Sequence, residues 1–374
     1  MLIDLRMAVN DGLGGLEMGD LSNLLSEVNY TGPAGSYRVR ETVARYVGQL
    51  VGTSINPETL FLTNGADQAI STALQAIGQI RSGSVYVQAP RYYKYPDQIR
   101  MFHRGDVKSQ SVGDNPLDAA PLLAAAQDSG VSAVVFNNPN NPLGYIQPQE
   151  VLSKLLDYSA ASKVHVLYDI VYADTLFQPS DSKHIRLPDG HKAQKNLWIV
   201  GSLSKSHGVA GWRLGFLICP FQETKRVEHI MRLQSSNVST VNQFLMNAVL
   251  VSPALKQRQE QLTARMAANF EGIVKHVKEH HPSLLPRILK PSAGMFFCLN
   301  AQGFYGNEED IEKALKNDGF LVLRGSDFGW PFLLRLPLTV RPQEYVPFFR
   351  SVEKFLPQEK LLSFNHQRPR HLQL

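Results

Sequence analysis

A lysine lies at the centre of the stretch GSLSKSHGVAGWRLGF, residues 201–216, among residues that can bind an anion. Lys205 comes soon after a short apolar run, so we expect it near the end of a buried strand. A lysine amine forms an imine with an aldehyde when it is neutral, which partial burial and a nearby cation both favour. Ser202, Ser204 and Arg213 supply hydroxyls and a planar cationic fork, the groups that bind a phosphate monoester.

An aldehyde and a phosphate in one small molecule describe pyridoxal phosphate, so Lys205 is a candidate for the residue that holds this cofactor. The stretch is equally compatible with a surface lysine that follows a buried strand, in which case the glycines only mark turns. The choice between these interpretations depends on what the rest of the chain places beside Lys205.

The elements that would position these residues alternate between strand and helix. From about residue 58 to 218, short apolar runs typical of buried parallel strands are separated by segments with helical spacing, one of them over 116–130. This alternation predicts an α/β fold with a mostly parallel, doubly wound sheet flanked by helices. In such sheets, ligands bind outside the carboxyl ends of the strands.

A smaller α+β domain is expected after a long amphipathic helix over residues 255–280. Its predicted strands cover residues 291–300, 320–324 and 332–336, and its predicted helix covers 308–316. We therefore predict three parts: an N-terminal arm over 1–30 that joins the small domain, a large cofactor-binding domain over 31–255, and a small domain over 256–374.

The first candidate site at a strand end is a turn between a strand and a helix. The strand over 60–63 passes through Gly65, Ala66 and Asp67 directly into a helical pattern. Free backbone N–H groups and the positive end of the helix dipole meet at such a junction, which suits an anion. A plain strand-to-helix turn without a ligand is the alternative.

Other candidate residues also follow predicted strands. Tyr92 comes shortly after one and could stack on a flat ring or pack half-buried. Asn141 lies in an amide- and proline-rich loop after the strand over 133–136. Asp169 ends a buried strand, where a carboxylate is costly unless it meets a cation or a protonated nitrogen, and Tyr172 comes three residues later. Helix capping is the alternative for Asp169.

The composition limits the kinds of molecule that the protein is expected to bind and the compartment in which it is expected. The 374 residues carry a net charge of +5, but Lys and Arg form no long blocks and no nucleic-acid motif accompanies them, so we expect anionic small molecules and no nucleic acid. Cys219 and Cys298 sit in apolar runs, as buried thiols do in a reducing compartment. Without a secretory signal or an apolar run long enough to span a membrane, the sequence predicts a cytoplasmic protein with no metal-ligand cluster.

Together these residues resemble those of the fold type I pyridoxal-phosphate enzymes, and within them the class I/II aminotransferases related to aspartate aminotransferase. The resemblance extends from about Tyr30 to Arg335. It implies that Lys205 is the Schiff-base lysine and later the general base. It also implies that Asp169 pairs with the pyridine nitrogen of pyridoxal 5′-phosphate.

The resemblance also implies roles for the residues around this pair. By this likeness, Tyr172 and Asn141 hold the ring hydroxyl, Tyr92 stacks on the ring, and Arg335 binds the substrate α-carboxylate. Arg213 and Ser202 resemble the phosphate ligands of the family. The turn around the phosphate is represented by Gly65, Ala66 and Asp67. Tyr30 resembles the tyrosine that reaches the phosphate of the neighbouring subunit. A homodimer is therefore implied.

Some positions depart from the family pattern. Ala8 stands where many members have a glycine beside the substrate, and the N-terminal helix that covers the substrate in relatives is expected to be short or missing. Arg324 replaces a usual proline and would add a cation near the substrate entrance. A further hypothesis is that Arg232 corresponds to the arginine that binds the acidic side chain of the substrate in aspartate-specific members.

The implied function is transfer of an amino group from an L-amino acid to a 2-oxo acid. The segment over 203–215 is similar to aminotransferases that act on arginine and other bulky amino acids. The alternative is a lyase, replacement enzyme or cyclase of a biosynthetic pathway on the same fold, motivated by Arg324 and the short N-terminus. A cofactor-sensing or nucleic-acid-binding protein without catalysis is a third possibility, against which the full catalytic set argues.

Overall fold

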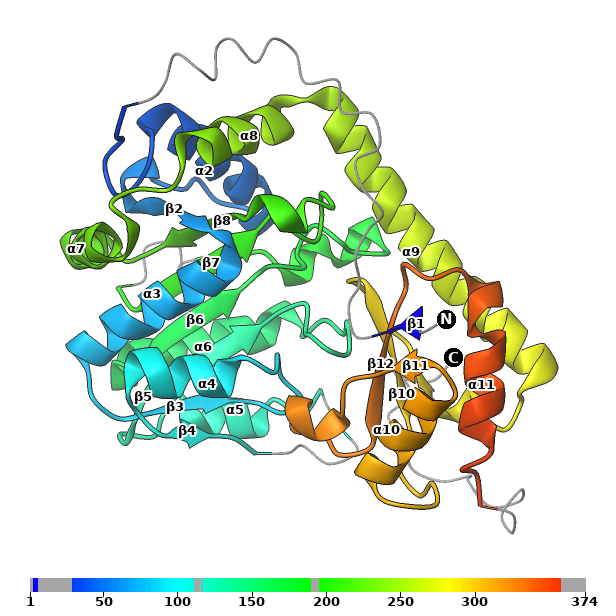
Figure 1. Cartoon of the computed structure of the whole chain (residues 1–374). Coiled ribbons are helices and arrows are strands. Elements are labelled where there is room, and N and C mark those ends of the chain that lie inside the picture. Colours follow the sequence, from blue (N-terminus) through cyan, green and yellow to red (C-terminus); the bar gives the residue numbers. More distant parts are fainter. Residues whose placement is uncertain (1–2, 6–28, 111–114, 116, 190–194, 358–374) are drawn as a thin grey trace.

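The structure is a computed structural model that describes residues 3–5, 29–110, 115, 117–189 and 195–357 (Figure 1). A large sheet with helices on both sides occupies one side of the view, and a smaller group of strands and helices built from the C-terminal third occupies the other. The long helix α9, Pro253–His280, runs from the first group to the second.

The large sheet has seven strands in the order β2-β8-β7-β6-β5-β3-β4. Their bounds are Leu60–Asn64 (β2), Ser84–Val87 (β3), Val107–Lys108 (β4), Val131–Asn137 (β5), His165–Asp169 (β6), Leu197–Ser202 (β7) and Leu214–Ile218 (β8). Only β8 runs antiparallel to its two neighbours, β2 and β7. The other pairings are parallel, which confirms the predicted α/β fold with a mostly parallel sheet.

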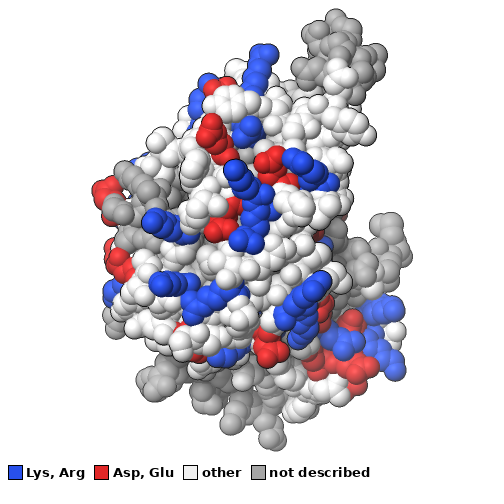
Figure 2. Space-filling model, turned by 90° about the vertical axis from the view of Figure 1, so that its left-hand side faces the viewer, with Lys and Arg blue, Asp and Glu red and all other residues white. Residues whose placement is uncertain are grey.

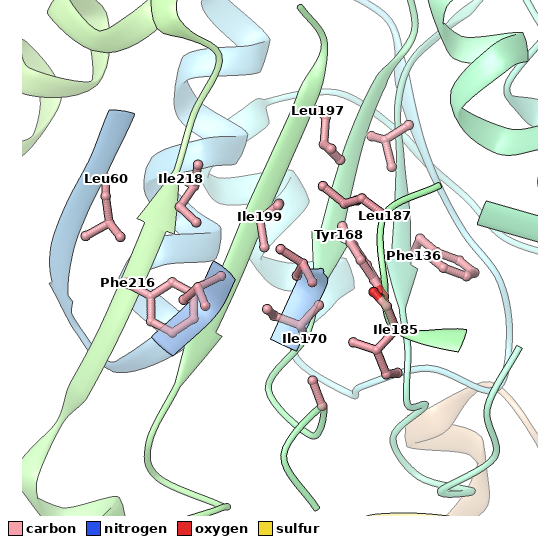
Figure 3. Close-up of a cluster of buried hydrophobic side chains, with 14 of the residues drawn as sticks. Leu60, Phe136, Tyr168, Ile170, Ile185, Leu187, Leu197, Ile199, Phe216 and Ile218 are labelled. Atoms are coloured by element: carbon pink, nitrogen blue, oxygen red, sulfur yellow. The ribbon is translucent and has the colours of Figure 1, made fainter. Parts of the chain in front are cut away.

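Apart from the edge strand β4, both faces of this sheet are buried, because alternate side chains of the strands enter different hydrophobic clusters. In β7, Ile199 joins the cluster shown in Figure 3, whereas Trp198 and Val200 join the cluster on the opposite face. The first face is covered by α2 (Tyr37–Val51), α5 (Ala120–Ala125), α6 (Gln149–Ser162) and α8 (Thr240–Val251). The second is covered by α3 (Gly65–Ile80), α4 (Tyr95–Gln98) and α7 (Thr224–Ser235).

The C-terminal part has its own hydrophobic cluster. Its strands are β9 (Ile288–Leu289), β10 (Phe296–Asn300) and β12 (Leu333–Pro337) in the order β12-β10-β9, with β11 (Phe320–Leu321) paired to β1 (Ile3–Asp4), and its helices are α10 (Glu308–Asn317) and α11 (Val346–Glu353). Leu5 follows β1 and is buried in this cluster, so the first described residues pack with the C-terminal ones.

Some predicted elements are shorter in the structure. The helix expected over 116–130 is reduced to α5. At the start of α5 the Asp118 carboxylate accepts a hydrogen bond from Ala120 N, and beyond its end the Asp128 carboxylate accepts one from Gly130 N, so both side chains favour turns there. The strand expected over 291–300 begins at Phe296, since Ala293 N instead donates to Gly144 O of the large part.

Charge is dispersed on the face that Figure 2 shows, where Lys and Arg lie among Asp and Glu rather than in one block. This matches the absence of long basic runs in the sequence. In the part of the chain that the structure describes, no helix is both long enough and apolar enough to cross a membrane.

Candidate active site

The sheet brings the candidate residues to one edge. Strands β2, β5, β6 and β7 are parallel to one another, so their carboxyl ends lie on the same side. Asp169 is the last residue of β6 and pairs in register with Asn137, the last residue of β5. Lys205 follows the end of β7, and Gly65 follows the end of β2. Residues far apart in sequence are thus positioned by neighbouring strands.

Lys205 is half-buried at this edge. Burial is the largest cause that lowers the pKa of its amine, and the nearby cations of Arg335, Arg213 and Lys94 add to it while Asp67 opposes them, so that the pKa lies at about 8. At pH 7 such a lysine is neutral in roughly a tenth of molecules, compared with fewer than about one in a thousand for an ordinary lysine. The structure therefore gives Lys205 the environment that a nucleophilic amine needs.

Asp169 is a buried carboxylate with two donors on it. The Tyr95 hydroxyl donates to its Oδ2 at 2.6 Å, and Val171 N donates to its Oδ1 at 2.9 Å. Burial raises the pKa of this carboxyl to about 6, and the two hydrogen bonds limit the rise. Among the described residues, no Lys, Arg or His forms an ion pair with it. A protonated ring nitrogen would supply the missing positive partner.

An arginine from the segment before β8 lies at the start of α3. A side chain at Gly65, whose φ is +75°, would collide with the Arg213 guanidinium. Arg213 Nη1 donates to Ala210 O at 3.0 Å and Nη2 to Asn64 O at 3.4 Å, so the cation lies at the start of α3. The first N–H groups of a helix have no partner within it. Cation and helix N-terminus therefore face the same space, which suits a phosphate.

The two serines of the predicted phosphate set are buried and bonded to each other. Ser202 Oγ lies 2.8 Å from Ser204 Oγ and donates to Leu214 O at 2.7 Å, while Ser204 N donates to Ser202 Oγ at 3.1 Å. The Ser202 proton is thus engaged by the backbone of β8, which the sequence did not indicate. Their contact with a phosphate stays a prediction.

Tyr92 contacts the α3 turn rather than lying free. Its hydroxyl donates to Asp67 Oδ1 at 3.2 Å, and its ring meets Tyr93 and Tyr95 edge-on at centroid distances of 5.0 and 5.4 Å. The Lys94 amine lies 3.1 Å from Asp67 Oδ2. The turn and the residues after β3 are therefore tied together, and stacking of Tyr92 on a ring stays a prediction.

Arg335 comes from β12 of the C-terminal part and is buried against two rings. Its guanidinium carbon lies 3.9 Å from the Phe296 ring centroid and 4.8 Å from that of Phe328, and Nη1 donates to Asn141 Oδ1 at 3.1 Å. Tyr172 is buried nearby, and the Arg335 charge opposes the rise in its hydroxyl pKa that burial causes. Both parts of the chain thus meet at this site.

Other predicted residues do not join this cluster. Tyr30 is 88% exposed. Arg324, expected to add a cation near the substrate, instead pairs with Glu312 of α10 at 2.5 Å, because an acidic helix face lies beside its loop. Arg232 pairs with Glu228 one turn earlier on α7. Ala8 lies outside the described residues.

Sequence reasoning missed two residues next to Tyr92. Tyr95 is fully buried and reaches Asp169, 74 positions further along the chain. Lys94 reaches Asp67. The dense run Tyr92-Tyr93-Lys94-Tyr95 after a strand was the available signal, but spacing alone does not tell which side chain faces the sheet edge.

Comparison with known proteins places the whole arrangement in a family. A family model described as aminotransferase class I and II matches residues 23–348. The chain is 24% identical over 331 residues to the aspartate aminotransferase of Thermotoga maritima, which covers 88% of this chain and 84% of that relative. It is also 24% identical over 338 residues to a probable aspartate/prephenate aminotransferase of Aquifex aeolicus, with shares of 88% and 84%.

Solved structures agree with this comparison. The fold matches the crystal structure of the Thermotoga maritima aspartate aminotransferase with a TM-score of 0.79 at 23% identity, covering 95% of this chain and 92% of the other. It matches an aromatic aminotransferase of Pyrococcus horikoshii with a TM-score of 0.81 at 19% identity, covering 94% of both.

The chain therefore belongs to the class I and II aminotransferases, since the family model spans most of its length. Members of this family use pyridoxal 5′-phosphate, and this chain is an aminotransferase that depends on that cofactor. The resemblance seen in the sequence is confirmed.

The residues present fit this cofactor. The buried Asp169 carboxylate has hydrogen-bond donors but no ion-pair partner among the described residues, as a site for a protonated nitrogen requires. At the other end, Gly65 leaves room for the Arg213 guanidinium at the start of α3, where a phosphate could meet a cation and free backbone N–H groups. Lys205 follows β7, which lies between β6 and β8 in the sheet and so between these two ends.

Proposed function

We propose that the protein transfers an amino group from an L-amino acid to a 2-oxo acid, with Lys205 as the residue that holds the cofactor. The observation that carries this proposal is that the half-buried Lys205 follows β7, the strand paired with β6, which ends in the buried Asp169. A nucleophilic amine and an acid that can keep a ring nitrogen protonated are the two groups that this chemistry needs.

Each residue then has a separate task. When bound, the cofactor supplies an electron sink for the pair left at the substrate α-carbon. Asp169 holds the proton on the ring nitrogen, and Tyr172 and Asn141 bind the ring oxygen. The Lys205 amine, when it is not bound to the cofactor, would act as the general base that moves the proton from the substrate α-carbon to the cofactor. Arg335 binds the substrate carboxylate with its guanidinium fork.

The phosphate and the ring face are assigned to the remaining candidates. Arg213, Ser202, Ser204 and the turn of Gly65, Ala66 and Asp67 would hold the phosphate, and Tyr92 would lie against the ring. The guanidinium of Arg213 at the start of α3 supports this assignment. The two serine hydroxyls support it less directly, since they bond each other.

The proposed amino donor is bulky, and arginine-like substrates are the first to test. This proposal rests on the segment over 203–215. The relatives are named for aspartate, prephenate or aromatic substrates, so family membership alone does not choose the side chain. One of the two observations that motivated the lyase or cyclase alternative is weakened, because Arg324 forms an ion pair with Glu312.

The proposed assembly is a homodimer in the cytoplasm, with Tyr30 reaching the partner's phosphate. Tyr30 is exposed, and so are Tyr37 on α2 and Val241 and Val251 on the adjoining α8, apolar side chains of the kind that a second copy would cover. Two buried, unpaired cysteines suit a reducing compartment. The proposed division remains 1–30, 31–255 and 256–374, supported by the separate C-terminal hydrophobic cluster.

The test is the visible absorbance of the purified protein with cofactor, beside Lys205→Ala, during titration with single amino acids. A visible band that one amino acid bleaches, with release of the matching 2-oxo acid, supports the proposal and names the donor. A band that returns while a different product accumulates without an oxo acid would favour the lyase or cyclase. No band in the wild-type protein with added cofactor would contradict the whole proposal.

A further inference from the structure

An acidic side chain stands where the proposed function places a phosphate. Asp67 is the third residue of α3, and its carboxylate has three partners. Lys94 Nζ lies 3.1 Å from Oδ2, Arg213 Nη2 lies 3.8 Å from the same oxygen, and the Tyr92 hydroxyl donates to Oδ1 at 3.2 Å. A carboxylate stabilises a helix N-terminus, but it competes there with any other anion.

The cations available at this turn have to serve two anions. Arg213 is held over the start of α3 by Ala210 O and Asn64 O, so it faces both the turn and Asp67. If Asp67 had Arg213 as its sole cationic partner, the carboxylate would offset the charge that a phosphate needs. Lys94 removes this conflict, because its amine is closer to Asp67 than Arg213 is.

Lys94 is placed for this task by its neighbours. Its amine lies 6.0 Å from the Tyr92 ring centroid and 5.9 Å from that of Tyr93, within the range of cation–π attraction. It also contributes to the positive potential at Lys205. About two fifths of the side chain is exposed.

We propose that Lys94 is the counter-charge of the phosphate site: it neutralises Asp67 and so leaves Arg213 and the α3 N-terminus to the phosphate of the cofactor. The inference rests on the proposed function, since it presumes the phosphate at this turn. Lys94 acts through Asp67 and is a positioning residue.

The inference has a signature that a merely structural role lacks. Removing the Lys94 charge leaves Asp67 to compete for Arg213, so affinity for a phosphate should fall. Removing both charges leaves Arg213 free again, so affinity should recover. Asp67→Asn alone should bind a phosphate at least as tightly as the wild type. A lysine that only packed against the tyrosines would show no such recovery.

The experiment measures the dissociation constants of pyridoxal 5′-phosphate and of pyridoxal, which lacks the phosphate, for the full chain stripped of cofactor. For Lys94→Met we expect pyridoxal 5′-phosphate to bind about five- to tenfold more weakly and pyridoxal to change less than twofold. Lys94→Arg should retain most of the affinity, and the double variant Lys94→Met with Asp67→Asn should recover it. Inorganic phosphate should compete less well for Lys94→Met.

Lys108→Met is the matched control. Lys108 forms an ion pair of 2.8 Å with Asp128 at similar exposure, but on the edge strand β4, so its loss should change neither constant. Equal weakening of both ligands by Lys94→Met, or no recovery in the double variant, would overturn the inference. Should Lys94→Met fail to fold, Lys94→Gln and the double variant give the same comparison. A wild-type protein that binds neither ligand would instead overturn the proposed function.

Discussion

Replacing Asp169 by asparagine should stabilise the cofactor-free protein at pH 8 while abolishing turnover. Burial raises the pKa of this carboxyl to about 6 in the folded protein, above its ordinary value of 3.8. Because the folded pKa is the higher one, stability that the neutral acid contributes at low pH is lost as the pH rises through 6. The Asp169→Asn side chain cannot ionise and avoids that loss.

The expected gain in the free energy of unfolding follows from the difference of about two units between the folded and the ordinary pKa. This difference corresponds to ~3 kcal/mol at pH 8 and roughly half of that at pH 5. The amide keeps the hydrogen bond from Val171 N but alters the one with Tyr95, which reduces the gain, so we expect about 1–3 kcal/mol at pH 8. The assay compares urea midpoints of wild type and variant at both pH values, without cofactor.

Asp174→Asn is the control for this prediction. Burial also raises the pKa of Asp174 to about 6, but its carboxylate accepts from the Tyr46 hydroxyl at 3.2 Å and is near Lys256, and among the described residues no hydrogen bond or ion pair joins it to one proposed to hold the ring. The Asp174→Asn substitution should stabilise the protein in the same pH range and leave turnover intact. An Asp169→Asn protein no more stable than wild type at pH 8, or equally stabilised at pH 5, would refute the reasoning.

Three further substitutions follow from the site. Tyr95→Phe removes a 2.6 Å hydrogen bond to the Asp169 carboxylate, so the acid limb of the kcat/KM profile should move up by about 1–2 pH units; an unchanged profile would contradict this. Gly65→Ala forces a Cβ into Arg213 at a φ of +75°, so cofactor affinity should fall at least about tenfold, as equilibrium dialysis would detect. Arg335→Lys loses the fork and its aromatic stacking, so steady-state kinetics should give a KM for the amino acid about 10- to 100-fold higher, with the cofactor spectrum unchanged.

The sheet and its edge were predictable because they depend on local patterns. Apolar runs such as 133–136 and 165–168 define central strands wherever they occur, and the turn formers after them fix where ligands can approach. The long helix α9 was predictable for the same reason, since its spacing holds over many turns.

Contacts between distant side chains were not predictable in this way. The hydrogen bond from Tyr95 to Asp169 depends on β3 lying two strands from β6 in the sheet order. The pairing of Arg324 with Glu312 depends on how α10 packs beside its loop. Neither packing leaves a period or spacing in the sequence, and the same holds for Lys94 and Asp67.

The central claim is that Lys205 holds the cofactor, and its most direct test is reduction of the protein with borohydride in the presence of pyridoxal 5′-phosphate, followed by peptide mapping. We expect one added pyridoxyl phosphate group per chain, on the peptide that contains Lys205, and none on Lys205→Ala. A label on Lys94 or on another lysine of the wild-type protein, with Lys205 unmodified, would contradict the account.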